Sequence, residues 1–202
     1  MKIKRLFSCS VILAALCAPM ALAQSNDSAA DQPLTIQQRK KNQQERIANG
    51  IQSGQLTAGE TKNLERKEAN LNGEERRMRA ADDGKLTAAD RAKLNRQQNR
   101  LSNQIYADKH NANTAHYGNG RIGQRQENQQ DRIAQGIGSG QLTPREAANL
   151  ENKEQGLNRE VAGMRQANGG KLSKADKQVV NQQQNKLSKQ IYNKKHNASK
   201  GY

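Results

Sequence analysis

Isolated apolar residues recur at helical spacing in the first half of the chain, with polar residues filling the positions between them. They form three sets, namely Ile36, Ile47 and Ile51, then Leu64, Leu71 and Met78 at seven-residue steps, then Leu94, Leu101 and Ile105. Each apolar stripe is one residue wide. Glu68 and Glu75 beside the second stripe and Gln98 within the third are expected to restrict burial to one side of each helix. Because short helices are marginal alone, the pattern predicts three α-helical segments that pack their stripes together.

The same pattern returns 86 residues later. Asn42–Ala112 align with Asn128–Ala198 without a gap, and roughly 43 of the 71 pairs are identical. We therefore expect an all-α protein built by tandem duplication of a three-segment helical unit, with a marginal core. The expected organisation is a signal peptide (1–23), a flexible N-terminal tail (24–37), a first helical repeat (38–112), a linker (113–123) and a second helical repeat (124–202). The sequence leaves open whether the two repeats pack together.

One short phrase occurs twice in each repeat, as "GQLTAGE", "GKLTAAD", "GQLTPRE" and "GKLSKAD". Its glycine suits the left-handed end of one helix, its leucine can fill the joint, and its Thr or Ser with a later Glu or Asp can form a capping box on the next helix. Pro144 suits a first helical position. The predicted turn residues are Gly54, Leu56, Thr57 and Glu60; Gly84, Leu86, Thr87 and Asp90; Gly140, Leu142, Thr143 and Glu146; and Gly170, Leu172, Ser173 and Asp176.

The phrase also resembles the second half of an EF-hand loop, which has Gly at loop position 6, an apolar residue at position 8 and an acidic residue at position 12. The resemblance implies EF-hand-like helix-loop-helix pairs whose two loops could lie side by side through their leucines. When Gly84 is placed at position 6, however, positions 1 and 3 are Arg79 and Ala81. A cation and an aliphatic side chain cannot ligate calcium, so we expect no metal and no cofactor. Plain helical hairpins remain the alternative.

The N-terminus has the order of a secretory signal peptide: basic "MKIKR", an apolar run, then "ALA" before Gln24. We expect a bacterial protein that is periplasmic or secreted after cleavage near Ala23. A lipid anchor on Cys17 is the alternative, although Leu16 is large for that position. Cys9 and Cys17 both lie in this segment, so the mature chain is expected to have neither a thiol nor a transmembrane span.

Composition raises the possibility of disorder. The chain has no Trp, and Leu, Ile and Val form roughly one residue in eight after the leader. The regular helical spacing argues for folding instead.

Charge points to a class of partner. The formal net charge is +15, of which roughly +12 remains after the leader. The excess is concentrated in the third helix of each repeat, beside amide-rich runs such as "NRQQNRLSNQIY". The candidate polyanion-binding residues are Arg91, Lys93, Arg96 and Arg100 in the first repeat and Lys174, Lys177, Lys186, Lys189, Lys194 and Lys195 in the second. Such a surface attracts an acidic polymer or an acidic protein, for example lipopolysaccharide, acidic polysaccharide or extracellular DNA. Charge that serves only solubility is the alternative.

Candidate chemistry is sparse. His110 and His196 each follow a tyrosine by four residues, which fits a helix C-terminus better than a metal or catalytic site. No nucleophile elbow and no Gly-rich phosphate loop occurs, so we expect no enzyme. The sequence favours an exported basic helical binding protein of open oligomeric state. The alternatives are a chaperone-like protein that holds clients on exposed Leu and Ile stripes, and a calcium-responsive EF-hand-like module.

Overall fold

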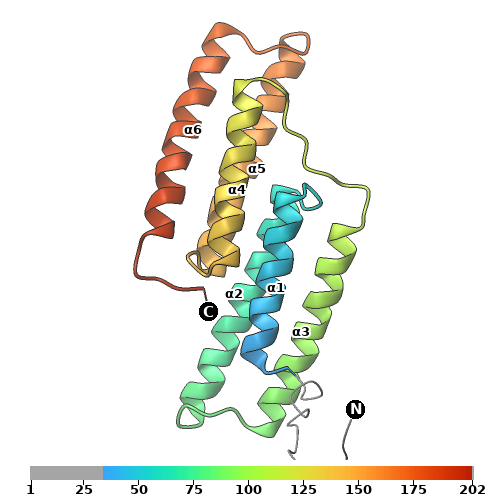
Figure 1. The fold of residues 1–202 in the computed structure, drawn as a ribbon, viewed down its shortest axis with the longest axis vertical. Coiled ribbons are helices and arrows are strands. Elements are labelled where there is room, and N and C mark those ends of the chain that lie inside the picture. The colour runs from blue at the N-terminus through green and yellow to red at the C-terminus, as the bar shows by residue number, and fades with distance from the viewer. Residues whose placement is uncertain (1–33, 202) are drawn as a thin grey trace, which may run out of the picture. The chain divides into compact units, whose positions relative to one another are not determined.

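A computed structural model describes residues 34–201 of the chain, and this part is entirely α-helical, with six helices and no strand (Figure 1). The helices are α1 (Ile36–Gln52), α2 (Ala58–Ala81), α3 (Ala88–Lys109), α4 (Arg121–Gly138), α5 (Pro144–Ala167) and α6 (Lys174–Lys195). The expected all-α class is therefore confirmed. The predicted signal peptide and residues 24–33 of the predicted tail lie outside the described residues.

Helix starts follow local capping signals. Thr35 caps α1 in a capping box with Gln38, so this helix begins inside the segment expected to be a tail. Gly120 is the N-cap of α4 and has no side chain to bond, so α4 begins inside the expected linker. The other four helices begin at the predicted Thr or Ser, each with both hydrogen bonds of a capping box.

The turns after α1 and α4 have the same construction. Gly54 and Gly140 both adopt a φ of 69°, which L side chains rarely adopt. The Leu56 N–H donates to the Gly50 carbonyl at 2.9 Å, and the Leu142 N–H donates to the Gly136 carbonyl at the same distance. Both leucine side chains are fully buried. Each leucine therefore fills the joint between two helices.

The two turns of one repeat lie at opposite ends of its second helix. Helix α2 is continuous over 24 residues, which corresponds to about 36 Å at 1.5 Å per residue. Figure 1 shows the α1–α2 and α2–α3 turns at the two ends of this rod. The expectation that paired loops lie side by side is therefore wrong, because an uninterrupted helix separates them.

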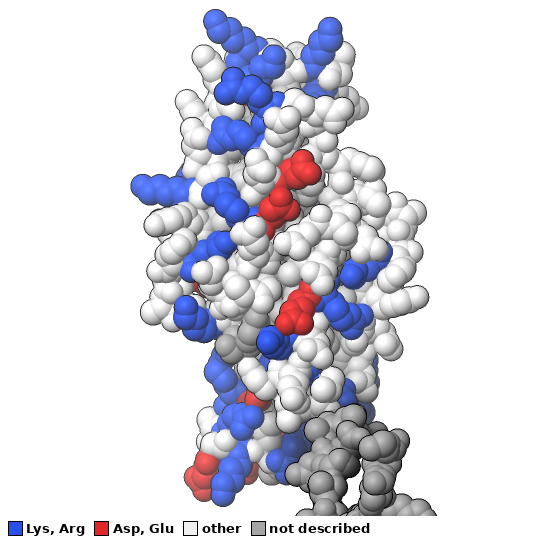
Figure 2. Space-filling view, in the orientation of Figure 1, with Lys and Arg blue, Asp and Glu red and all other residues white. Residues whose placement is uncertain are grey.

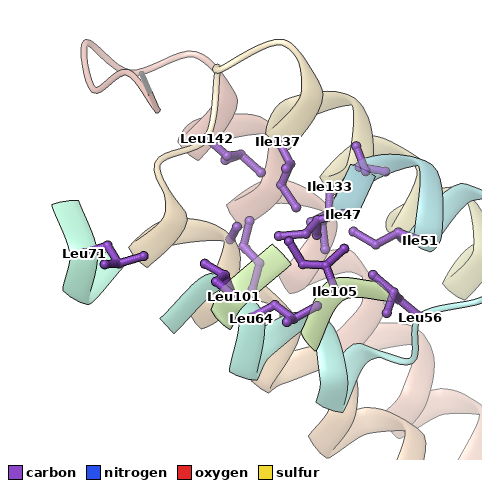
Figure 3. Close-up of a cluster of buried hydrophobic side chains, with 14 of the residues drawn as sticks. Ile47, Ile51, Leu56, Leu64, Leu71, Leu101, Ile105, Ile133, Ile137 and Leu142 are labelled. Carbon is purple, nitrogen blue, oxygen red and sulfur yellow. The ribbon is translucent and has the colours of Figure 1, made fainter. Parts of the chain in front are cut away.

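Helices from both halves share one core. Helix α1 packs against α4 and α2 packs against α5, while α3 and α6 each pack on the other two helices of their own half. Figure 3 shows Ile47, Ile51 and Ile105 of the first half meeting Ile133 and Ile137 of the second. Residues 34–201 thus form a single compact unit in which the apolar stripes cover one another.

Polar side chains are buried within this unit, contrary to the expectation that Glu68, Glu75 and Gln98 would restrict burial to one side. These residues are 1%, 7% and 2% exposed. For Glu68 and Glu75 the physical reason is that α2 packs on helices of both halves, so more than one of its faces is covered. Gln98 donates to the Ile36 carbonyl at 3.0 Å, and Glu75 pairs with Lys40 and Arg79. Hydrogen bonds and ion pairs thus offset part of the cost of burial.

Candidate anion-binding surface

Helices α3 and α6 are the outer helices of the unit. Among the described helices, α3 contacts only α1 and α2, and α6 contacts only α4 and α5. Nine of the ten candidate cations on these helices are exposed, and Lys195 is half-buried. The two helices belong to different halves of the chain, so the structure places the candidate residues on two separate faces.

Most of these cations have no acidic partner. Lys93 pairs with Glu74 at 2.6 Å, and Lys194 pairs with Glu146 at 3.3 Å. Hydrogen bonds from Lys93 and Gln97 hold the pKa of Glu74 below its ordinary value. In the described part of the chain, no ion pair and no side-chain hydrogen bond engages the remaining eight: Arg91, Arg96, Arg100, Lys174, Lys177, Lys186, Lys189 and Lys195. The charge of the seven exposed side chains among these is therefore available to a partner, whereas burial and the nearby Arg132 lower the pKa of Lys195.

The space-filling view shows how this charge is distributed. Figure 2 shows Lys and Arg along the edge that α6 forms and at the ends of the unit, with only a few Asp and Glu on the visible face. Along α6, Lys174 and Lys177 lie near the start of the helix, Lys186 and Lys189 follow after two further turns, and Lys194 is close to the end. The basic side chains therefore extend along the whole length of α6 instead of clustering at one place.

The amide-rich runs are partly structural. Gln98 and Gln184 are buried and donate to the carbonyls of Ile36 and Ile122, at 3.0 and 2.9 Å. Gln43 and Gln129 donate in return to the carbonyls of Gln98 and Gln184. Hydrogen bonds from these central amides therefore join the third helix of each repeat to its first helix, and the amides do not belong to the outer surface.

The histidines lie at helix ends, where they contact backbone and tyrosine. His110 and His196 are the C-caps of α3 and α6, and the Nδ1 atom of each lies 2.7 Å from the carbonyl oxygen of a tyrosine, Tyr106 or Tyr192. Each imidazole stacks on the same tyrosine, with ring centroids 4.1 Å apart. Next to these caps, Asn111 and Asn197 donate to Glu60 and Glu146. The end of each third helix is thus tied to the start of the second.

Sequence reasoning missed four interior carboxyls. Glu65, Glu151 and Glu154 are 0% exposed and Glu68 is 1% exposed. Burial raises the pKa of Glu68, Glu151 and Glu154 to about 8, and burial with the nearby Glu68 carboxyl raises the pKa of Glu65 well above its ordinary value. The signal that could have found them is their retention in both repeats beside the leucine stripe, as Glu65/Glu151 and Glu68/Glu154.

These interior carboxyls affect the net charge of the protein. Burial favours the neutral form of these four carboxyls, so they contribute less negative charge than the formal net charge of +15 assumes. Within residues 34–201, no group of three or more His, Cys, Asp or Glu side chains has a geometry that could hold a metal ion. The exposed cations of α3 and α6 offer electrostatic attraction and hydrogen bonding.

The apolar stripes lie inside the fold. Ile47, Leu64 and Ile105 are fully buried. Among the described residues, the large apolar side chains that are exposed are Leu34, Tyr106, Val179 and Tyr192. Holding a client on the Leu and Ile stripes would thus require the helices to separate first.

Comparison of the chain with protein-family models, with curated proteins and with solved structures finds no match. In the part of the chain that the structure describes, no helix combines the length and the apolar character needed to cross a bilayer.

Proposed function

We propose that this chain is an exported, non-enzymatic binding protein that engages acidic polymers through the outer faces of α3 and α6. The observation that carries the proposal is the set of seven exposed basic side chains on the two outer helices that form no ion pair within residues 34–201. Each cation that neutralises a phosphate or sulfate group releases a condensed counterion, which favours binding without any sequence reading.

A linear polymer fits the distribution of the charges better than a compact ligand does. Helix α6 spans 22 residues, or about 33 Å, and its lysines are spread over that length. The exposed aromatic side chains on these helices, Tyr106 and Tyr192, already stack on histidines. Base stacking is therefore not the expected mode, and the proposal is recognition of a charged backbone.

We further propose that the two halves arose by tandem duplication. Helices α2 and α5 each have 24 residues, and α3 and α6 each have 22. Corresponding bonds agree closely, since Gln43 donates to Gln98 at 2.8 Å and Gln129 donates to Gln184 at 2.9 Å. Duplication supplies two related basic faces, so one polymer that reaches both gains from multivalency.

Export is part of the proposal, and it rests on the signal-peptide pattern of residues 1–23. The polymers that such a protein meets are those of the cell envelope or the extracellular medium, including lipopolysaccharide, acidic polysaccharide and released DNA.

The test is a titration of the purified protein into fluorescently labelled duplex DNA, a convenient acidic polymer, at several salt concentrations. The proposal predicts saturable binding whose affinity falls steeply with salt, with a slope of about 0.9 for each phosphate neutralised. Absence of binding at low salt would reject the proposal. Suppression of client aggregation with little salt dependence would favour the chaperone-like alternative.

A further inference from the structure

The second half of the chain contains a cavity that the polymer-binding surface does not explain. It is open to solvent, has a volume of about 540 Å³, and lies where the start of α4 meets the α5–α6 turn. Its volume is within the range of about 300 to 1,000 Å³ that small-molecule sites occupy.

The wall of this cavity is basic. Arg121, Arg165, Lys171 and Lys177 contribute to the lining, which contains no carboxylate. The first turn of α4, which forms one side, also contains no acidic residue. Four cations around one volume repel one another, so an anion between them is stabilised by all four.

The floor of the cavity is apolar. Ile122 and Leu172 line it; Ile122 belongs to a second hydrophobic cluster with Leu157, Val161 and Val180, and Leu172 packs against that cluster. Leu172 is half-buried, whereas its counterpart in the first half, Leu86, is 7% exposed. The lining thus combines an apolar surface with positive charge.

Comparison with the first half shows what distinguishes this end of the unit. Arg79 occupies the position equivalent to Arg165, and it donates from Nε and Nη2 to Glu75 at 2.9 and 2.8 Å. In the second half Val161 replaces Glu75. The Arg165 side chain accordingly makes no hydrogen bond or ion pair within residues 34–201.

Glycine leaves room for this guanidinium. A Cβ atom at Gly118 would lie 3.1 Å from Nη2 of Arg165. The replacement of the carboxylate by Val161, with a glycine beside the guanidinium, therefore leaves an arginine free at the cavity. Arginine offers paired donors that match phosphate and carboxylate oxygens.

We propose that this cavity binds a small organic anion that carries a phosphate-like group on an apolar body. The anionic group contacts Arg165 together with Arg121, Lys171 and Lys177, and the apolar body covers Ile122 and Leu172. The proposal does not depend on polymer binding, because Arg121, Arg165 and Lys171 lie outside α3 and α6, and Lys177 is the one named residue that the two surfaces share.

The test uses phenyl phosphate and inorganic phosphate as probes in isothermal titration calorimetry with the purified protein. Phenyl phosphate is expected to bind at one site, at least tenfold more tightly than inorganic phosphate. The variant R165Q is expected to weaken phenyl phosphate binding at least tenfold. The matched control is R79Q, which changes the equivalent arginine in the first half and is expected to leave binding unchanged.

Three results would overturn the proposal: no saturable binding, equal affinity for the two probes, or equal losses in R165Q and R79Q. An NMR titration of the wild-type protein keeps the test decisive if R165Q fails to fold. Amide shifts confined to Gly120–Gly123 and Gly170–Lys177 would support the site, and shifts that extend to Lys186, Lys189 and Lys194 of α6 would contradict it. Failure of DNA binding leaves these results unaffected, so the two proposals fail separately.

Discussion

The variant E151Q tests the claim that the interior carboxyls are neutral in the folded protein. Glu151 is 0% exposed and accepts a hydrogen bond from Gln130 at 3.0 Å, and burial raises its pKa from 4.5 to about 8. Below pH 4.5 the carboxyl is protonated in both the folded and the unfolded chain. Between pH 4.5 and 8 only the folded chain holds the proton, so the free energy of unfolding falls as the pH rises through this interval.

The magnitude follows from the difference in pKa. Each pKa unit corresponds to 1.36 kcal/mol, so the rise from 4.5 to about 8 corresponds to a loss on the order of 5 kcal/mol by pH 9. This is comparable to the whole stability of a small domain. Glutamine cannot ionise, and its amide oxygen can still accept the bond from Gln130. We therefore expect E151Q to lose less stability than the wild type between pH 4.5 and 9, by up to about 5 kcal/mol.

The assay is chemical denaturation followed by far-UV circular dichroism at four pH values from 4.5 to 9. The control is E127Q, which makes the same charge change at an exposed position of α4 and is expected to follow the wild-type pH dependence. Parallel pH profiles for E151Q and the wild type would refute the claim that Glu151 is buried and neutral.

Three further predictions concern a helix cap, a close approach at the α4–α5 turn and the basic cavity. Replacing Thr143 with Ala removes the acceptor for the Glu146 N–H and should cost about 0.5 to 2 kcal/mol in a urea titration, and no loss there would contradict the capping role. The variant G136A places a Cβ atom 2.7 Å from Cδ1 and Cγ of Leu142 and should cost about 1 to 3 kcal/mol, whereas G156A, in open space, should be neutral or stabilising. An equal response of the two glycines would exclude a close approach at Leu142. The variant V161E should pair with Arg165, as Glu75 pairs with Arg79, and abolish phenyl phosphate binding; retained binding would count against Arg165 as the anion contact.

The local elements could be predicted from sequence because their causes are local. A glycine with positive φ and a Thr or Ser with an acid three residues later are short-range signals, and the structure has both at Gly54 and Thr57. The single apolar stripe likewise predicted which faces meet, as the burial of Leu64 and Ile105 shows.

The packing of the two halves against each other could not be predicted from the sequence, because it depends on contacts between residues that are far apart in the chain. Whether Glu68 lies at a surface or inside depends on α5, which is far away in the chain and covers a second face of α2. The resemblance of the turns to paired loops misled for a related reason, since it ignored the length of the helix between Leu56 and Leu86. The basic cavity could not be predicted from the sequence either, because its lining comes from the start of α4, the end of α5, the α5–α6 turn and the first turns of α6.

The measurement that tests the central claim most directly compares two variants of equal charge. One replaces Lys174, Lys186 and Lys189 of α6 with Gln, and the other replaces Lys41, Arg76 and Arg77 of the first half, all of which are exposed. Their affinities for labelled duplex DNA are measured over a range of salt concentrations. If α6 binds the polymer backbone, the first variant loses about 2 to 3 units of salt slope and the second keeps the wild-type slope. Equal slopes for the two variants would show that net charge alone drives the association and would contradict a binding surface on α6.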